Sequence, residues 1–160
     1  MYMVDEGRMP ISRVTRYYAF LAVMSIVASF GVMPQLSGRV RMRPLTMVTA
    51  ALGGLLLVAI VIPSSEMSLL FTAGPTSLAL TLTISACAAL VSGSVSEARQ
   101  GSVMGNNAAL QVGAESLGVF VAGLMAAVVV KLPLPIFGGV LMLAALLLVP
   151  FRSPQVGDIP

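Results

Sequence analysis

The stretch Val103–Val130, VMGNNAALQVGAESLGVFVAGLMAAVVV, contains a single charged residue, Glu115. A helix needs about 20 mostly apolar residues to cross the roughly 30 Å hydrocarbon core of a bilayer, and this stretch is longer. Four other stretches share this apolar character: about Tyr17–Leu36, Leu45–Ile62, Leu69–Val95 and Leu134–Pro150. Because short connections make neighbouring helices antiparallel, the sequence predicts an all-α transmembrane bundle of about five helices over residues 17–151. A polar segment, 1–16, precedes it and a tail, 152–160, follows it.

Composition leads to the same class of protein. Apolar residues make up 58% of the 160 and charged residues only 9%, whereas soluble domains carry about 25% charged residues. A water-facing surface cannot be built from this inventory without exposing large apolar patches. Helices are expected rather than a barrel, because barrel strands alternate apolar and polar residues over about ten positions.

The first apolar run follows Arg8, Arg13 and Arg16, as the apolar part of a signal peptide would. The run is too long for a signal peptide, however, and no small-x-small cleavage site follows it cleanly. We therefore interpret it as a retained membrane span. The third span, Leu69–Val95, is expected to be interrupted early by Gly74-Pro75.

The sequence lacks the parts of most catalytic and metal sites. It has no histidine and one cysteine, Cys87, which lies among alanines in an apolar run and is expected to be a packing residue. Metal-ligand clusters, a disulfide framework and Cys/His or Ser/His catalysis are therefore disfavoured. The net charge of +3 forms no basic patch interleaved with aromatic residues, so nucleic acid is not an expected partner. No cofactor and no enzymatic activity are expected.

Positive charges are divided almost equally between the two sides that alternating helices define. One side carries five of them: Arg39, Arg41, Arg43, Arg99 and Arg152. The other side carries four: Arg8, Arg13, Arg16 and Lys131. Cytoplasmic loops are enriched in lysine and arginine. Arg39, Arg41 and Arg43 lie in one compact loop, the arginine loop, which favours placing that loop and the C-terminus in the cytoplasm. We expect a multi-pass protein of the cytoplasmic (inner or plasma) membrane.

The fourth span contains the main candidate site. Asn107, Gln111 and Glu115 are spaced four residues apart, which puts them on one helical face. A carboxylate at mid-bilayer costs on the order of 3 kcal/mol, so Glu115 should face a partner or a water-filled cavity, or be protonated. The row is expected either to line a substrate or proton pathway or to hold a neighbouring helix by hydrogen bonds.

Small residues mark expected points of close helix approach. They are a row on the fourth span and two glycine pairs: Ala114, Gly118, Ala122 and Ala126, then Gly53-Gly54 and Gly138-Gly139.

Weaker candidates lie elsewhere. Tyr18, Ser25 and Ser29 share a face of the first span and either line the pathway or bond back to the helix backbone. The arginine loop is interpreted as topogenic charge, or as a latch onto helix C-termini or onto Glu97.

The segment Pro34-Gln35-Leu36-Ser37-Gly38-Arg39-Val40-Arg41-Met42-Arg43-Pro44-Leu45 resembles the cytoplasmic loop signature of the major facilitator superfamily, G-x-L-[SA]-D-R-x-G-R-R-P-L. The agreement includes the signature positions at Arg39 and Arg43. Pro34, Gly38 and Arg41 depart from it, as in the decayed copy that the family carries between helices eight and nine. Gly38 stands where the signature has an aspartate, so the resemblance does not imply a gating role for this loop.

A second stretch, Ser96–Gly105, is similar to the polar turn and Q-G-x-x-x-G helix start between helices ten and eleven of the family's drug-efflux and metabolite branches. In that register the five spans correspond to helices eight to twelve. The resemblance implies one part of a transporter in which two six-helix halves rock around a central site. The chain would then be a fragment, a decayed gene or a partner of another chain, and its missing partner would be the amino-terminal half.

The sequence thus predicts part of a secondary active transporter of an unidentified small molecule, with proton-coupled efflux or metabolite transport as the expected activities. Asn107, Gln111 and Glu115 would line the pathway, with Tyr18 and Ser25. The alternative is a non-transporting multi-pass scaffold or assembly subunit. An intramembrane enzyme is a distant third, because no paired carboxylates or nucleophile–base set is present.

Overall fold

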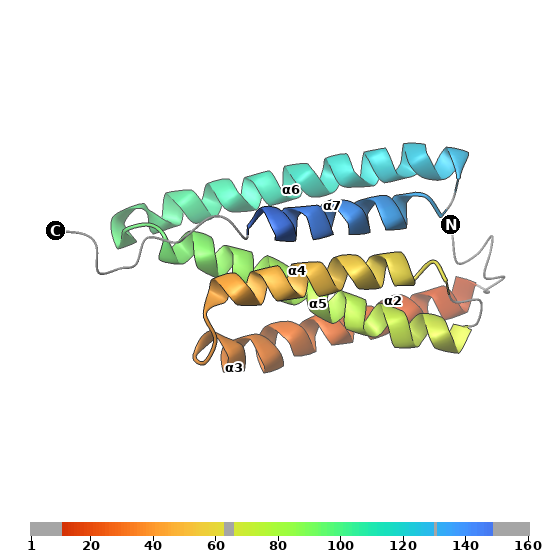
Figure 1. Cartoon of the computed structure of the whole chain (residues 1–160), viewed down its shortest axis with the longest axis horizontal. Helices are drawn as coiled ribbons and strands as arrows, with labels where there is room; N and C mark the ends of the chain where they lie inside the picture. Colours follow the sequence, from red (N-terminus) through yellow and green to blue (C-terminus); the bar gives the residue numbers. More distant parts are fainter. Residues whose placement is uncertain (1–10, 63–65, 130, 149–160) are drawn as a thin grey trace.

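The computed structural model describes residues 11–62, 66–129 and 131–148, and these ranges form helices and no strand (Figure 1). Four helical stretches are long and apolar enough to cross a membrane: Thr15–Ser37, Met42–Ala59, Met67–Gly93 and Glu97–Val128. The predicted all-α transmembrane fold is therefore confirmed. The tail 152–160 and most of the polar segment 1–16 lie outside the described residues.

The first span is a continuous rod of three segments, which are α2 (Ile11–Ile26), the π-helix η1 (Val27–Val32) and α3 (Met33–Ser37). The backbone N–H of Met33 donates to the carbonyl of Ala28, five residues earlier. Proline has no N–H, and its ring clashes with the carbonyl four residues before it. A π-helical stretch that ends just before Pro34 widens the helix there and relieves this clash. The helix therefore continues through Pro34 to Ser37, close to the predicted end of the span at Leu36.

The next two spans are α4 (Met42–Ala59) and α5 (Glu66–Gly93). Pro44 lies in the first turn of α4, where a missing N–H costs nothing because those N–H groups have no partner within the helix. Pro75 lies inside α5, which runs through it without a break. The predicted interruption at Gly74-Pro75 is wrong. The ring of Phe20 packs against Gly74, 3.1 Å from the position that a Cβ on Gly74 would take.

The last two spans are α6 (Glu97–Val128) and α7 (Pro133–Leu147). Helix α6 begins several residues before the predicted start at Val103, so the polar residues from Glu97 to Ser102 are helical rather than loop. At a rise of about 1.5 Å per residue, the 32 residues of α6 extend over roughly 48 Å and the 15 of α7 over roughly 22 Å.

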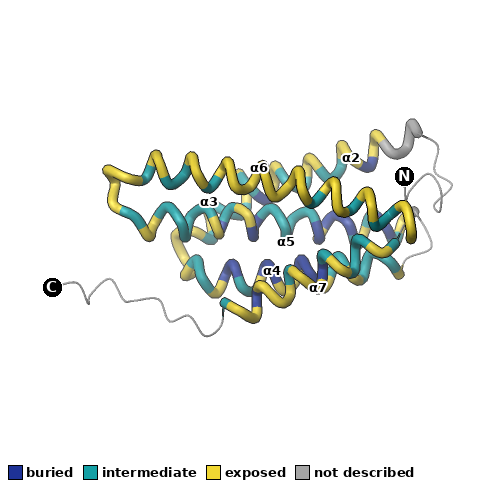
Figure 2. The backbone as a smooth tube through the Cα atoms, turned by 90° about the horizontal axis from the view of Figure 1, so that it is seen from above, coloured by how far each residue is buried: buried dark blue, intermediate teal, exposed yellow. Residues whose placement is uncertain are grey.

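The core is built by α4, which packs closely against α5 on one side and α7 on the other. Figure 2 shows the buried residues concentrated on these helices and α6 without any. The side chain of Thr46 in α4 is 1% exposed. Between α4 and α5, the hydroxyl of Thr83 donates to the hydroxyl of Thr49 at 3.0 Å.

Alternate connections lie at the same end of the bundle. The α3–α4 turn, the α5–α6 turn and the end of α7 gather at one end, and the start of α2 and the α6–α7 connection lie at the other (Figure 1). This arrangement agrees with the alternation used to assign the two charged sides.

Candidate functional site

The main candidate site lies on α6, the helix least buried by the rest of the chain. Glu115 lies about 4 Å along the axis from the midpoint of the helix. Its Oε1 accepts a hydrogen bond of 3.0 Å from the Nε2 of Gln111, and both side chains are exposed. Asn107 is half-buried one turn earlier. The polar row is therefore a real feature of one helix face, and no other described helix covers its Gln111 and Glu115 side chains.

The middle of α6 stands clear of the bundle. Every residue from Ala108 to Leu117 is exposed, and Leu110 is 74% exposed. Helix α6 contacts α5 and, to a smaller extent, α7. A Cβ built at Gly118 would have nothing within 4 Å. The expected tight packing is therefore absent at Ala114 and Gly118 among the described residues, whereas Ala122 and Ala126 are half-buried.

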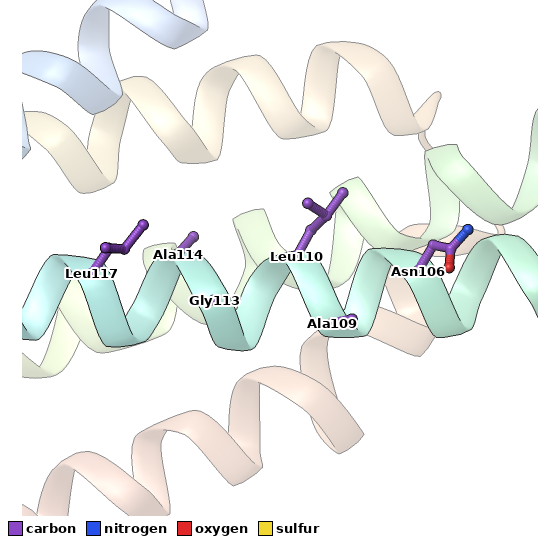
Figure 3. Close-up of a pocket in the computed structure, with 6 residues that line it drawn as sticks. All are labelled: Asn106, Ala109, Leu110, Gly113, Ala114 and Leu117. Carbon is purple, nitrogen blue, oxygen red and sulfur yellow. The ribbon is translucent and has the colours of Figure 1, made fainter.

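A shallow cleft of about 660 Å³ follows a different face of α6. It is lined by six residues that recur every three or four positions: Asn106, Ala109, Leu110, Gly113, Ala114 and Leu117. Figure 3 shows the side chains of Leu110, Ala114 and Leu117 rising from the same side of the helix. At 3.6 residues per turn this face lies far round the axis from Glu115. The cleft is mainly apolar, with the Asn106 amide as its one polar side chain.

A second polar cluster joins α2 to α5. The Oγ atoms of Ser25 and Ser77 are 2.9 Å apart, and Thr81 donates to Ser25 at 3.2 Å. Ser77 also donates to the backbone carbonyl of Leu21 at 3.1 Å. The hydrogen bonds therefore run in one direction, from Thr81 through Ser25 and Ser77 to Leu21. Each of these three hydroxyl groups therefore donates its proton to a hydrogen bond between α2 and α5.

The structure does not bring the two predicted sets of pathway residues together. Helix α6 and helix α2 lie at opposite edges of the bundle in Figure 1 and have no extensive contact. Tyr18 is 63% exposed and its ring packs edge-on against Tyr17, with ring centroids 6.1 Å apart. Tyr18 and Ser25 are thus separated from Asn107, Gln111 and Glu115 in the described chain.

Ser77 was missed by the sequence reasoning. Its signal was the spacing of four residues to Thr81, which puts two hydroxyls on one face of an otherwise apolar span. Thr81 alone is a weak signal, because a threonine in a helix commonly bonds back to its own backbone. The neighbouring Thr76 does so, donating to the carbonyl of Thr72 at 2.7 Å.

The arginine loop is partly a latch. Arg43 Nη2 donates to the carbonyl of Leu148 at 2.7 Å and thereby ties the start of α4 to the end of α7. This bond matches the expected latch onto a helix C-terminus, where carbonyls lack partners and the helix dipole favours a cation. Arg39 and Arg41 are exposed, and no ion pair joins Glu97 to the loop among the described residues.

Comparisons with known protein families, with curated proteins and with solved structures give no match to this chain. The site is therefore interpreted from its own chemistry. No group of three metal-binding side chains is found in the part of the chain that the structure describes. The α6 row offers one carboxylate, which can accept hydrogen bonds or exchange a proton, and neighbouring amides that can both donate and accept.

Proposed function

We propose that this protein is part of a secondary active transporter of a small molecule and that α6 contributes one wall of the transport pathway. The observation that carries the proposal is the Gln111–Glu115 pair, exposed near the middle of a membrane-spanning helix. A carboxylate at that depth is costly against lipid, and ionisable residues within spans mark substrate, ion or proton pathways. Other membrane helices, such as an amino-terminal transporter half, supply the opposite wall.

The loop signature at Arg39 and Arg43 supports the same proposal through its resemblance to the major facilitator superfamily. In that register the arginine loop is cytoplasmic and the protein resides in the inner or plasma membrane. Glu115 is the group that carries the proton if transport is proton-coupled, because it is the one acid on the polar row.

The test compares cells that produce the full protein with cells that lack it. The small molecules retained and released are profiled, and the compound whose distribution changes is then assayed in vesicles across a pH series. Glu115→Gln keeps the shape and removes the charge, so the pH dependence of transport should disappear. Ser116→Ala is the matched control, because Ser116 only bonds back to the carbonyl of Val112. An unchanged pH profile in the Gln variant would exclude the proton role.

A scaffold or assembly subunit is the second candidate, favoured by the exposure of α6 along its middle. It predicts that removing the protein changes no compound's distribution but lowers the amount of an assembled membrane complex. The profiling experiment separates the two functions.

A further inference from the structure

The side of α6 that carries Glu115 is built for contact with another helix. Ala108, Gln111, Glu115, Gly118 and Ala122 are spaced alternately three and four residues apart, so they form one stripe along the helix, the Glu115 stripe. Three of its members are small, and small residues allow two helix backbones to approach closely within a membrane. Its residues are exposed or half-buried, so the described helices leave the stripe largely open.

Lipid suits the apolar part of α6 but not this stripe. An ionised carboxylate has room for about four hydrogen bonds, and Glu115 receives the one from Gln111. Gln111 is neutral, so it supplies no positive charge to this carboxyl group near the middle of the helix.

The cations in the described part of the chain lie too far away to pair with Glu115. Arg99 is in the first turn of α6, about 24 Å along the axis from Glu115. Lys131 lies beyond the other end of the helix, and the arginine loop lies at the end of the bundle where α6 begins. A cation at the depth of Glu115 must therefore come from outside the described residues.

We propose that the Glu115 stripe binds a membrane-spanning helix that carries one lysine or arginine at mid-bilayer depth. The small residues allow the partner's backbone to pack closely against α6, and the partner's cation pairs with Glu115. Gln111 holds the carboxyl group in place through its hydrogen bond. Charge complementarity selects this occupant, because a purely apolar helix leaves the carboxylate as costly as lipid does. The inference depends on α6 spanning the bilayer and not on transport. A bound helix covers Gln111 and Glu115, so it is an alternative to a water-filled pathway along this face, and peptide binding and transport are measured separately.

The test uses the full protein in phosphatidylcholine vesicles and synthetic Leu/Ala-rich helices of about 21 residues. One peptide has Lys at its centre and the control peptide has Leu there. The protein has no tryptophan and one cysteine, Cys87. A tryptophan near one end of each peptide is therefore the sole donor, and a dansyl group on Cys87 is the acceptor for energy transfer.

We expect the Lys peptide to give half-maximal energy transfer at about tenfold lower concentration than the Leu peptide, consistent with the strength of polar contacts between membrane helices. Glu115→Gln should reduce this preference to near unity, and the control Leu124→Ala, an exposed apolar position on α6 outside the stripe, should keep it. Circular dichroism of each variant checks that the helices are intact.

Equal binding of the two peptides to the unaltered protein would overturn the proposal, whatever the variants do. Retention of the preference in Glu115→Gln would overturn it as well. If the unaltered protein forms dimers in vesicles that Glu115→Gln dissolves, and the Lys peptide does not compete, the stripe binds a second copy and the proposed occupant is wrong.

Discussion

Gly54 of α4 and Gly138 of α7 face each other so closely that neither has room for a side chain. A Cβ on Gly54 would lie 2.6 Å from the carbonyl oxygen of Gly138, and a Cβ on Gly138 would lie 2.6 Å from the carbonyl oxygen of Gly54. Side-chain atoms of Met142 and Val58 also lie within 3.0 Å of these positions, but the two carbonyl oxygens are backbone and cannot yield by rotating a side chain. This reciprocal contact sets the distance between the two helices.

Replacing Gly54 or Gly138 by Ala should therefore force α4 and α7 apart. Overpacking of a tight contact costs typically 1–3 kcal/mol, and we expect a loss of about that size for either substitution. Thermal unfolding in detergent, followed by circular dichroism, measures it. Gly139→Ala is the control, since nothing lies within 4 Å of its Cβ position. Equal stability of all three variants would show that the helices do not cross at this point.

The bond from Arg43 to the carbonyl of Leu148 gives a second prediction. Arg43→Gln removes a charged donor at the end of α7, and hydrogen bonds to charged groups contribute about 1.5–3 kcal/mol. Because Arg43 is only half-buried, we expect about 1 kcal/mol. The same unfolding assay measures this loss, and Arg39→Gln, in the exposed turn, should be neutral. If Arg43→Gln leaves the stability unchanged, the arginine loop acts as topogenic charge alone.

The hydroxyl chain between α2 and α5 should be cooperative. Ser77→Ala removes the donor to Leu21 and a partner of Ser25. Interhelical hydrogen bonds in membranes average about 0.6 kcal/mol, so the loss should be about 0.5–1 kcal/mol. A double-mutant cycle with Ser25→Ala measures the coupling between the two hydroxyls. If the stability losses of the two single substitutions simply add in the double variant, the hydroxyls are not coupled.

The helices could be predicted from the sequence because membrane spans leave a strong apolar signal in each segment. One proline position misled the prediction. Pro75 lies within an unbroken helix although the local rule predicts an interruption there. The ring of Phe20 packs against the neighbouring Gly74, and this is a tertiary contact that a local rule does not contain.

Small residues were informative only in part. Gly54 and Gly138 are a close contact as expected, whereas Gly118 has nothing near it. Four-residue spacing identifies a face that permits close approach, but it does not say whether a helix lies there. The polar row of Gln111 and Glu115 was predictable from the same spacing, since it is internal to one helix. Its separation from Ser25 was not, because that depends on how α2 and α6 are arranged.

Cysteine accessibility along α6 tests most directly whether this helix lines a transport pathway. Single cysteines at Asn107, Gln111, Leu110 and Leu124, in a Cys87→Ser background, are treated with a membrane-impermeant maleimide on the full protein in its membrane. A water-filled pathway predicts rapid reaction at the polar row, at Asn107 and Gln111, and slow reaction at Leu110 and Leu124. Equally slow reaction at all four positions would contradict a pathway along the Gln111–Glu115 face.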